Sequence, residues 1–392
     1  MGSRRQGEVP LAGGGAGSPE DPYQILTAEH LNAIGASKED WDKHFILLDD
    51  LDLNDLETEF HVIGTSDADA FRGVFDGNGK TISNFSLATG NNARGLFGVV
   101  DDPNALIEDL GLINPQVDGG TASAIGSLVG LLRIGKVTHC YAQGGSVSGA
   151  SNIGGLIGFV EGAIIPNAVE NCFAFVQVTG SGFNTGGLVG FNEGDISNSY
   201  AAGAVTGNDK VGGLVGNNIV SITRCYSVGA VNGTTEVGGL LGRNTGVGAI
   251  ADCFWDTQTS IQAAMCGFEG FGGSGCDDGD GQSTATLQNK STFSDAGWDF
   301  VQEATNGTQD FWAICQGAGY PQLAWQFLAG DFDICIVGVE LAGFAFISAQ
   351  FGREDCQEAN DYCLTADIDR SGVVDLADVE VVFGNWLLGL SP

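Results

Sequence analysis

Positive charge is scarce in this chain of 392 residues. Lys and Arg together number 15 against 49 Asp and Glu, which gives a formal net charge of −34. A surface with that charge repels the phosphate backbone of nucleic acids and anionic lipid headgroups. We therefore expect no nucleic-acid partner. Most of the acidity is explained as the charge of a solvated surface, although it also favours divalent cations.

Long apolar stretches are also missing. No run approaches the roughly 18 residues of a membrane span, and the apolar segment Phe344 to Ile347 closely follows Glu340. We therefore expect no span of a bilayer. The basic start, Met1 to Arg5, leads into no apolar signal core, so no signal peptide is visible. Residues 1–20 are predicted to form a flexible leader.

Cysteines spaced as Cys-X-X-Cys are absent, which argues against metal thiolate sites. The ten cysteines form two groups, one inside a repeated region and one beyond it. The second group is even in number and closely spaced, as is typical of disulfides in an oxidising compartment. It consists of Cys266, Cys276, Cys315, Cys335, Cys356 and Cys363.

Proline is rare, with 8 residues, whereas glycine is abundant, with 63. So much glycine without a Gly-X-Y period fits neither collagen nor an ordinary helical enzyme. The glycines belong to an internal repeat with the pattern Gly or Ser, Leu, apolar, Gly, whose last residue recurs at intervals of 26 to 32. The six copies are Gly95 to Gly98, Ser127 to Gly130, Gly155 to Gly158, Gly187 to Gly190, Gly213 to Gly216 and Gly239 to Gly242.

Two further elements follow each copy. The first is an apolar residue, two polar residues and usually Cys with an aromatic residue, as in Ile222 to Tyr226. The second is a valine before a polar residue and glycine, as at Val205, which reads as a strand entering a turn. Three short strands per repeat predict a β-solenoid.

Stacked coils place equivalent side chains about 4.8 Å apart, so like residues form columns. The repeat leucines are expected to form an interior column, and Cys140, Cys172, Cys225 and Cys253 a second buried one, which Ser199 interrupts. Packing explains the cysteines better than a metal or redox site does. An amide ladder at a turn is predicted for Asn192, Asn218 and Asn244.

These repeats, over roughly residues 94 to 254, resemble the GLUG repeat family, which is named for its Gly-Leu-hydrophobic-Gly core. Members occur in bacterial surface and secreted proteins, including some adhesins and proteases. The resemblance implies a solenoid architecture and, with the cysteine pattern, a secreted or cell-surface location. The family has no shared catalytic residues, so it implies none here.

The ends of the solenoid are less regular. Residues 21–93 are predicted to form an N-terminal cap and irregular first coils, beginning with a short helix that Thr27 caps and Gly35 stops. Strands are expected at Phe45 to Leu48, Phe71 to Phe75 and Thr81 to Ser83. The regular solenoid should cover 94–260. A C-terminal cap is predicted over 261–328, with buried tryptophans and a solvated loop at Asp277 to Gly281.

A calcium loop is predicted near the C-terminus. The segment from Asp367 to Asp378 places oxygen ligands at loop positions 1, 3, 5, 9 and 12, and Gly372 at position 6 permits the sharp turn. Position 7 contributes a backbone carbonyl, and Val374 is expected to anchor the loop in an apolar core. The predicted ligands of one Ca²⁺ are Asp367, Asp369, Ser371, Val373, Asp375 and Asp378.

The closing Asp378 and the helix expected from Leu376 to Leu388 resemble a dockerin type I loop. A complete dockerin has two such loops, but the upstream segment Asp331 to Phe351 offers Gly343 where a closing acid is needed. Residues 329–392 are thus expected to form a dockerin-like helical module with one calcium site. The resemblance implies a cohesin-like or cell-envelope partner.

The overall prediction is a mainly β protein, a parallel β-helix or β-solenoid with short capping elements and a small C-terminal α-helical calcium-binding module. The favoured function is a non-catalytic scaffold for adhesion to surface glycans or proteins. The alternative is a polysaccharide-active lyase or glycoside hydrolase. Its candidate face is one polar position per coil, which an ordinary outward polar position before an inward cysteine also explains: Asp109, His139, Asn171, Asn198, Arg224 and Asp252.

Overall fold

The structure is a computed structural model, and it describes residues 12–56, 58–162, 168–246, 248–270, 272–301, 305–327 and 373–374. The chain divides into two compact units, residues 1–282 and 283–392. The boundary falls inside the segment 261–328, which was expected to form a single cap. The predicted helical module, 329–392, lies outside the described residues except for Val373 and Val374.

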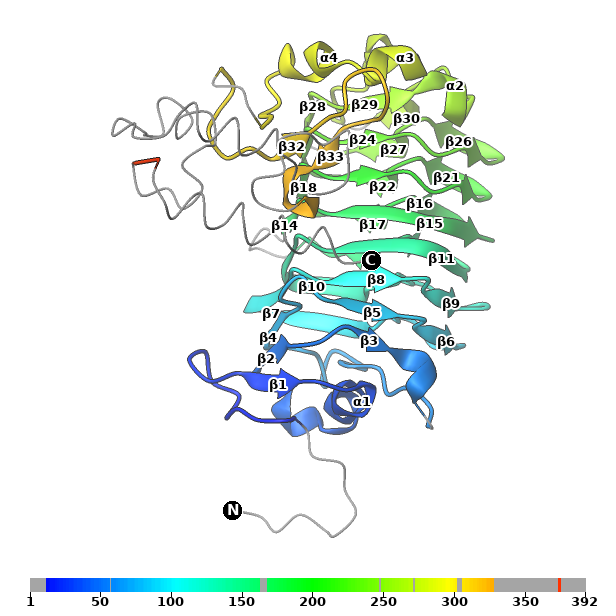
Figure 1. Cartoon of the computed structure of the whole chain (residues 1–392). Helices are drawn as coiled ribbons and strands as arrows, with labels where there is room; N and C mark the ends of the chain where they lie inside the picture. The colour runs from blue at the N-terminus through cyan, green and yellow to red at the C-terminus, as the bar shows by residue number, and fades with distance from the viewer. Residues whose placement is uncertain are drawn as a thin grey trace. The chain divides into compact units, whose positions relative to one another are not determined.

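The first unit is a β-solenoid, in which successive coils pair in parallel (Figure 1). Sheet A has 14 strands. Its main path is β1 (Tyr23–Ile25), β2 (His44–Leu47), β4 (Val74–Asp76), β7 (Phe97–Glu108), β10 (Val129–Thr138), β13 (Ile157–Val160), β17 (Val189–Asn192), β22 (Val215–Asn218), β27 (Leu241–Thr245) and β30 (Cys266–Gly270). A side branch consists of β14 (Ala168–Glu170), β18 (Asp195–Ser197), β23 (Ile222–Thr223) and β28 (Ile250–Ala251).

Two more sheets run along the solenoid, one over most of its length and one over four coils only. Sheet B has 13 strands and sheet C has four. Sheet B follows β3 (Leu51–Asp52), β5 (Thr81–Ser83), β8 (Gly111–Ile113), β11 (Tyr141–Gly149), β15 (Phe173–Gly180), β19 (Tyr200–Ala201), β24 (Tyr226–Ser227), β29 (Phe254–Asp256) and β31 (Gly281–Gln282), with β6 (Ser86–Ala88), β9 (Gln116–Asp118), β20 (Val205–Thr206) and β25 (Val231–Asn232) beside it. Sheet C contains β12 (Ile153–Gly154), β16 (Phe183–Gly186), β21 (Asp209–Gly212) and β26 (Thr235–Gly238).

The repeat leucines form the predicted interior column. All six are fully buried: Leu96, Leu128, Leu156, Leu188, Leu214 and Leu240. The glycines that flank them are required because the backbone of an adjacent coil lies against them. A Cβ on Gly190 would overlap with the backbone of Asn152 and Ile153, and one on Gly187 with the carbonyl of Gly213. The Gly-Leu-apolar-Gly pattern therefore follows from coil stacking.

The asparagine ladder is also confirmed, and it lies inside the solenoid. Asn192 donates through Nδ2 to Oδ1 of Asn218 at 2.8 Å, and Asn218 donates to Oδ1 of Asn244 at 3.0 Å. All three side chains are fully buried. Each amide also donates to a backbone carbonyl, at its own turn for Asn192 and Asn218 and in the next coil, at Ser274, for Asn244. The ladder thus satisfies polar groups that would otherwise be costly to bury.

Helix α1 (Ala28–Ala36) begins as predicted, because Thr27 accepts a hydrogen bond from the backbone N–H of His30. The prediction that Gly35 ends the helix is wrong. Gly35 lies inside the helix, where a Cβ would overlap with the backbone of His61. The expected strand from Phe71 to Phe75 is likewise displaced to β4, Val74–Asp76.

Shorter helices accompany the strands. In the first unit they are α2 (Thr257–Ser260) and the 3₁₀ turns Lys38–Asp40, Leu53–Asp55 and Asp278–Asp280. The second unit contains α3 (Thr284–Leu287), α4 (Lys290–Ser294), the antiparallel pair β32 (Trp312–Ala313) and β33 (Gln322–Leu323), and the turn Ala324–Gln326. Its Trp298 and Trp312 are fully buried, with ring centroids 4.4 Å apart. These two tryptophans pack in a core, as predicted.

Candidate functional site

The predicted calcium ligands lie almost entirely outside the described residues. Of the loop, the structure describes Val373 and Val374, and Val374 is fully buried. In the part of the chain that the structure describes, no group of three or more His, Cys, Asp or Glu side chains could hold a metal ion. The calcium site therefore stays a prediction.

The cysteine column is buried packing. Cys140, Cys172, Cys225 and Cys253 are free thiols at 0 to 1% exposure. Each Sγ lies 3.1 to 3.2 Å from the carbonyl two residues earlier, and Ser199 makes the same contact at 2.7 Å. Burial raises the pKa of Cys172 to about 12. This thiol stays protonated at neutral pH and is a poor metal ligand or nucleophile.

The polar position before each cysteine is a turn residue. The six residues at this position have φ between 45° and 55°, which is the left-handed region that non-glycine residues rarely adopt. Neighbours along the column bind one another. His139 lies 3.4 Å from both Asp109 and Asn171, and Arg224 Nε donates to Asn198 at 3.1 Å. These contacts give the polar side chains a structural role at the turns, and one group of acids next to them needs a separate explanation.

That group consists of Asp76, Glu108 and Asp109 at the first coils. Glu108 pairs with Asp76 across β4 and β7. Burial raises the pKa of Glu108, and the charges of Asp76 and Asp109 raise it further. Burial also raises the pKa of Asp109, whereas His139 opposes this effect. Two carboxyl groups with raised pKa are a candidate for acid–base chemistry.

Sheet A carries a row of side chains that sequence reasoning did not single out. We call it the sheet A strip, and its members lie in register on consecutive strands: Leu131, Phe159, Phe191, Asn217, Arg243 and Phe268. Phe159 is partly exposed, whereas its neighbours Ile157 and Val160 are fully buried. The strip therefore faces away from the core.

The rings of the strip are held in place by stacking. Phe159 and Phe191 lie 4.8 Å apart with planes only 7° from parallel. Each ring therefore covers a face of the other, and their edges form a continuous apolar line. At the other end, the guanidinium of Arg243 lies 4.9 Å from the Phe268 ring and pairs with Glu236. This ion pair raises the pKa of Arg243 and fixes its orientation.

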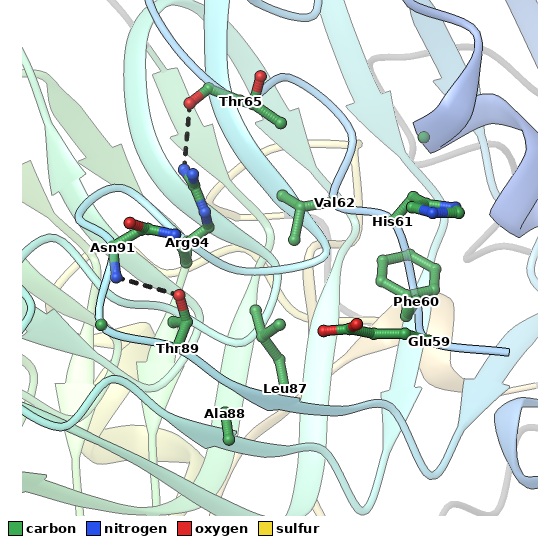
Figure 2. A pocket seen from close by; sticks show the side chains of 12 residues that line it. Glu59, Phe60, His61, Val62, Thr65, Leu87, Ala88, Thr89, Asn91 and Arg94 are labelled. Carbon is green, nitrogen blue, oxygen red and sulfur yellow. Dashed lines mark hydrogen bonds between the residues drawn. The ribbon is translucent and has the colours of Figure 1, made fainter.

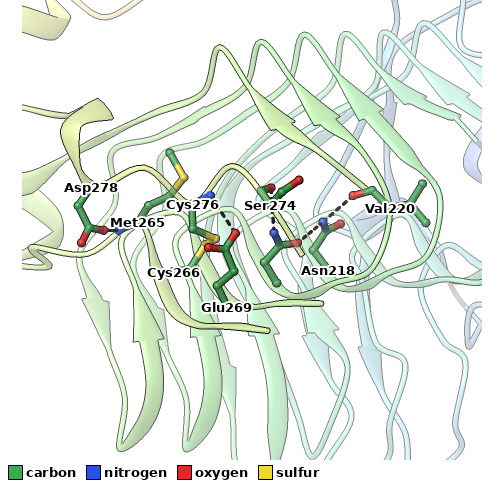
Figure 3. The surroundings of a disulfide bond; sticks show 9 residues. Asn218, Val220, Met265, Cys266, Glu269, Ser274, Cys276 and Asp278 are labelled. Carbon is green, nitrogen blue, oxygen red and sulfur yellow. Dashed lines mark hydrogen bonds between the residues drawn. A yellow bond between two sulfur atoms is a disulfide. The ribbon is translucent and has the colours of Figure 1, made fainter. Parts of the chain in front are cut away.

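A disulfide secures the last coil of sheet A (Figure 3). Cys266, the first residue of β30, is bonded to Cys276, as its close spacing suggested. Two acids near the disulfide accept backbone hydrogen bonds, one inside the loop between the cysteines and one just after it. Glu269 accepts a hydrogen bond from the backbone of Cys276 at 3.1 Å, and Asp278 accepts one from Met265 at 2.9 Å. Both acids thus have structural roles.

A pocket of about 480 Å³ opens at the first coils (Figure 2). It lies between the end of α1, the segment 59–65 and the strand β6 with the residues that follow it. Its lining combines apolar Phe60, Val62 and Leu87 with polar Thr89 and Arg94. The size is in the range of small-ligand sites. No sequence motif marked it.

Comparison with known proteins places these features in context. Residues 181–206 match the family model "The GLUG motif". The chain is 35% identical over 159 residues to "Halomucin" of Haloquadratum walsbyi, and 33% identical over 135 residues to a "Putative Gly-rich membrane protein" of Evansella cellulosilytica. These matches cover 38% and 32% of this chain but only 2% and 15% of the relatives.

Among solved structures, the chain is similar to "a putative immunoglobulin A1 protease" from Bacteroides ovatus. The TM-score is 0.59 at 19% identity, and the match covers 80% of this chain and 96% of that one. At this identity the likeness concerns the fold alone.

In the described residues, no helix is long and apolar enough to cross a membrane. The chain is a β-solenoid that carries the GLUG motif.

Proposed function

We propose that this protein is a secreted or cell-surface binding scaffold without catalytic activity, whose solenoid wall adheres to polysaccharide. The observation that carries the proposal is the sheet A strip. A core does not need Phe159 and Phe191 on its outer side, and partly exposed apolar lines of this kind often mark binding surfaces. Two polar side chains, Asn217 and Arg243, follow these rings in the same row.

The names of the relatives support the location. One is called a halomucin and the other a Gly-rich membrane protein. The disulfide between Cys266 and Cys276 fits an oxidising compartment outside the cytosol. A surface location is consistent with a ligand that is a glycan of a neighbouring cell or matrix.

The C-terminal module completes the proposal. The loop from Asp367 to Asp378 would bind one Ca²⁺ and stabilise a terminal attachment module. Its partner would be a cohesin-like or other cell-envelope protein. The wall would then bind the glycan while the module holds the chain to its own surface.

An enzyme is the second candidate, and the raised pKa values of Glu108 and Asp109 favour it. Against it, the two acids are not among the residues that line the pocket. The decisive test is incubation of the full chain with soluble polysaccharides, including polygalacturonate. We expect neither new reducing ends nor unsaturated products. Product formation that Glu108→Gln abolishes would overturn the proposal in favour of a lyase or hydrolase.

A further inference from the structure

Arg94 occupies a position that recurs once per coil, and it differs in kind from the residues at that position in the following coils. Its backbone pairs with Ile125, and the same position in the next coils is held by Ile153, Thr185 and Val211. Those four side chains are fully buried. The first coil thus has a cation where later coils place core residues. Such a departure from a local rule is expected at functional sites.

The guanidinium of Arg94 is held in place but not neutralised. Nη1 donates to the carbonyls of Thr65, Asn92 and Ala93 at 3.2, 3.0 and 2.8 Å. Within the described residues, Arg94 has no ion pair, and its Nε and Nη2 make no hydrogen bond. Burial lowers the pKa of this side chain, but an arginine remains charged. An oriented pair of N–H donors is therefore left for a ligand.

The pocket around Arg94 defines the class of ligand. One guanidinium balances one negative charge, and a carboxylate fits its two free donors side by side. A phosphate dianion would leave excess negative charge beside Glu59, which lies across the pocket from Arg94 in Figure 2. The other titratable lining residue, His61, also lies across the pocket from Arg94 in Figure 2, so Arg94 is the cation that a ligand would meet there, and a carboxylate is the ligand group that matches it.

The remaining walls suit a sugar ring. Phe60, Val62 and Leu87 form an apolar side, and the Phe60 ring is fixed edge-on against Phe85, 5.2 Å between centroids. Thr89 and Asn91 supply polar atoms on the other side, and the Asn91 backbone donates to Thr89 Oγ1 at 3.1 Å. Apolar walls with a few oriented polar groups are the usual form of a small-ligand site.

We propose that this pocket binds a sugar acid, with the carboxylate on Arg94, the ring against Phe60 and Leu87, and hydroxyls toward Thr89 and Asn91. The inference deepens the proposed function, on which it rests, because it gives the scaffold a second site specific for acidic glycans. This site shares no residue with the sheet A strip, so an experiment can disprove one of the two proposals without affecting the other.

The test is a titration of the full chain in 0.15 M NaCl, followed by ligand-observed NMR, with three probes. D-galacturonate should bind with a millimolar Kd, and D-galactose, which lacks the carboxylate, about tenfold more weakly, since a charge-assisted pair contributes roughly 1.4 kcal/mol. N-acetylglycine, a carboxylate without a sugar ring and a mimic of a peptide C-terminus, should also bind more weakly than galacturonate.

Variants locate the site. Arg94→Gln should weaken galacturonate binding about tenfold, whereas Arg72→Gln, which removes an arginine outside the pocket lining, should leave it unchanged. Glu59→Gln removes a like charge from an exposed position and should tighten binding about twofold to threefold.

Equal binding of galactose and galacturonate would overturn the proposal, as would absence of galacturonate binding or an unaffected Arg94→Gln. If N-acetylglycine bound as tightly as galacturonate, the ligand would be a peptide C-terminus and the sugar-acid proposal would be wrong. If Arg94→Gln does not fold, two measurements still test the proposal: the comparison of galacturonate with galactose on the wild-type protein, and the effect of Glu59→Gln on galacturonate binding. Polysaccharide binding through the strip should survive Arg94→Gln, which separates the two proposals.

Discussion

Asn192 and Asn218 are joined side chain to side chain, Nδ2 to Oδ1 at 2.8 Å, although 26 residues separate them. The bond links two consecutive coils inside the solenoid, where neither side chain is exposed. Its central partner, Asn218, also donates to Val220 and Asn244. The stability of the stack should therefore depend strongly on this one residue.

Asn218→Ala should lower the free energy of unfolding by about 2–4 kcal/mol, because it leaves buried amide and carbonyl groups without partners. Urea denaturation followed by circular dichroism measures the change. Asn232→Ala, at an exposed position, is the matched control and should change stability by less than about 0.5 kcal/mol. Equal effects of the two variants would show that the ladder does not stabilise the stack.

Thr185→Val should stabilise the protein. The Thr185 side chain is fully buried, and its hydroxyl has no hydrogen-bond partner within the described residues. The equivalent position in the next coil is already valine, Val211. We expect a gain of about 1 kcal/mol, visible as a higher melting temperature. Thr206→Val, on an exposed Thr, should give no gain, and a destabilised Thr185→Val would mean that the hydroxyl is satisfied.

The buried thiols should make stability fall at alkaline pH. The pKa of Cys172 is raised from an ordinary 9.0 to about 12, so folding favours the protonated form. Its contribution is fully present below pH 9 and is lost as pH rises from 9 toward 12, by about 1.4 kcal/mol per pH unit. Urea unfolding at pH 8, 9.5 and 11 measures the slope.

Cys172→Ser should reduce that alkaline slope, since Ser199 shows that a hydroxyl fits the same contact in the next coil. The free thiols should also resist a thiol reagent until the protein unfolds. Rapid labelling of the folded protein at pH 8, or an unchanged slope in Cys172→Ser, would contradict the buried, protonated column.

Calcium should bind once to the full chain. Calorimetric titration is expected to show one saturable site that both Asp367→Ala and Asp378→Ala remove, since these residues occupy the first and last ligand positions. Asp277→Ala, in the other Asp-rich loop, is the matched control and should retain the site. Absence of binding at millimolar calcium would refute the calcium module.

The sequence predicted the solenoid because the spacing of its leucines and glycines reflects one coil. The same stacking made the cysteine column and asparagine ladder predictable. The sequence did not predict the last coil, because β30 continues sheet A at Cys266 without a repeat motif. It also did not predict the left-handed turn at His139, because side-chain type alone does not reveal a positive φ.

Arg94 and the sheet A strip were missed for a different reason. The position of Arg94 in an apolar column depends on the register between the first coil and the next, and no spacing rule marks it. Nothing in the sequence marks Phe159 and Phe191 as residues of an outer face. Only the strand register shows that they stack on the outer side of sheet A.

The most direct test of the binding scaffold is co-sedimentation of the full chain with insoluble cellulose, chitin and peptidoglycan. At least one should retain the wild-type protein, and the double variant Phe159→Ser with Phe191→Ser should lose about tenfold in affinity. Phe175→Ser removes a phenylalanine that is 53% exposed on sheet B and should bind normally. Full binding by the double variant, or no binding by the wild type, would contradict adhesion through the sheet A strip.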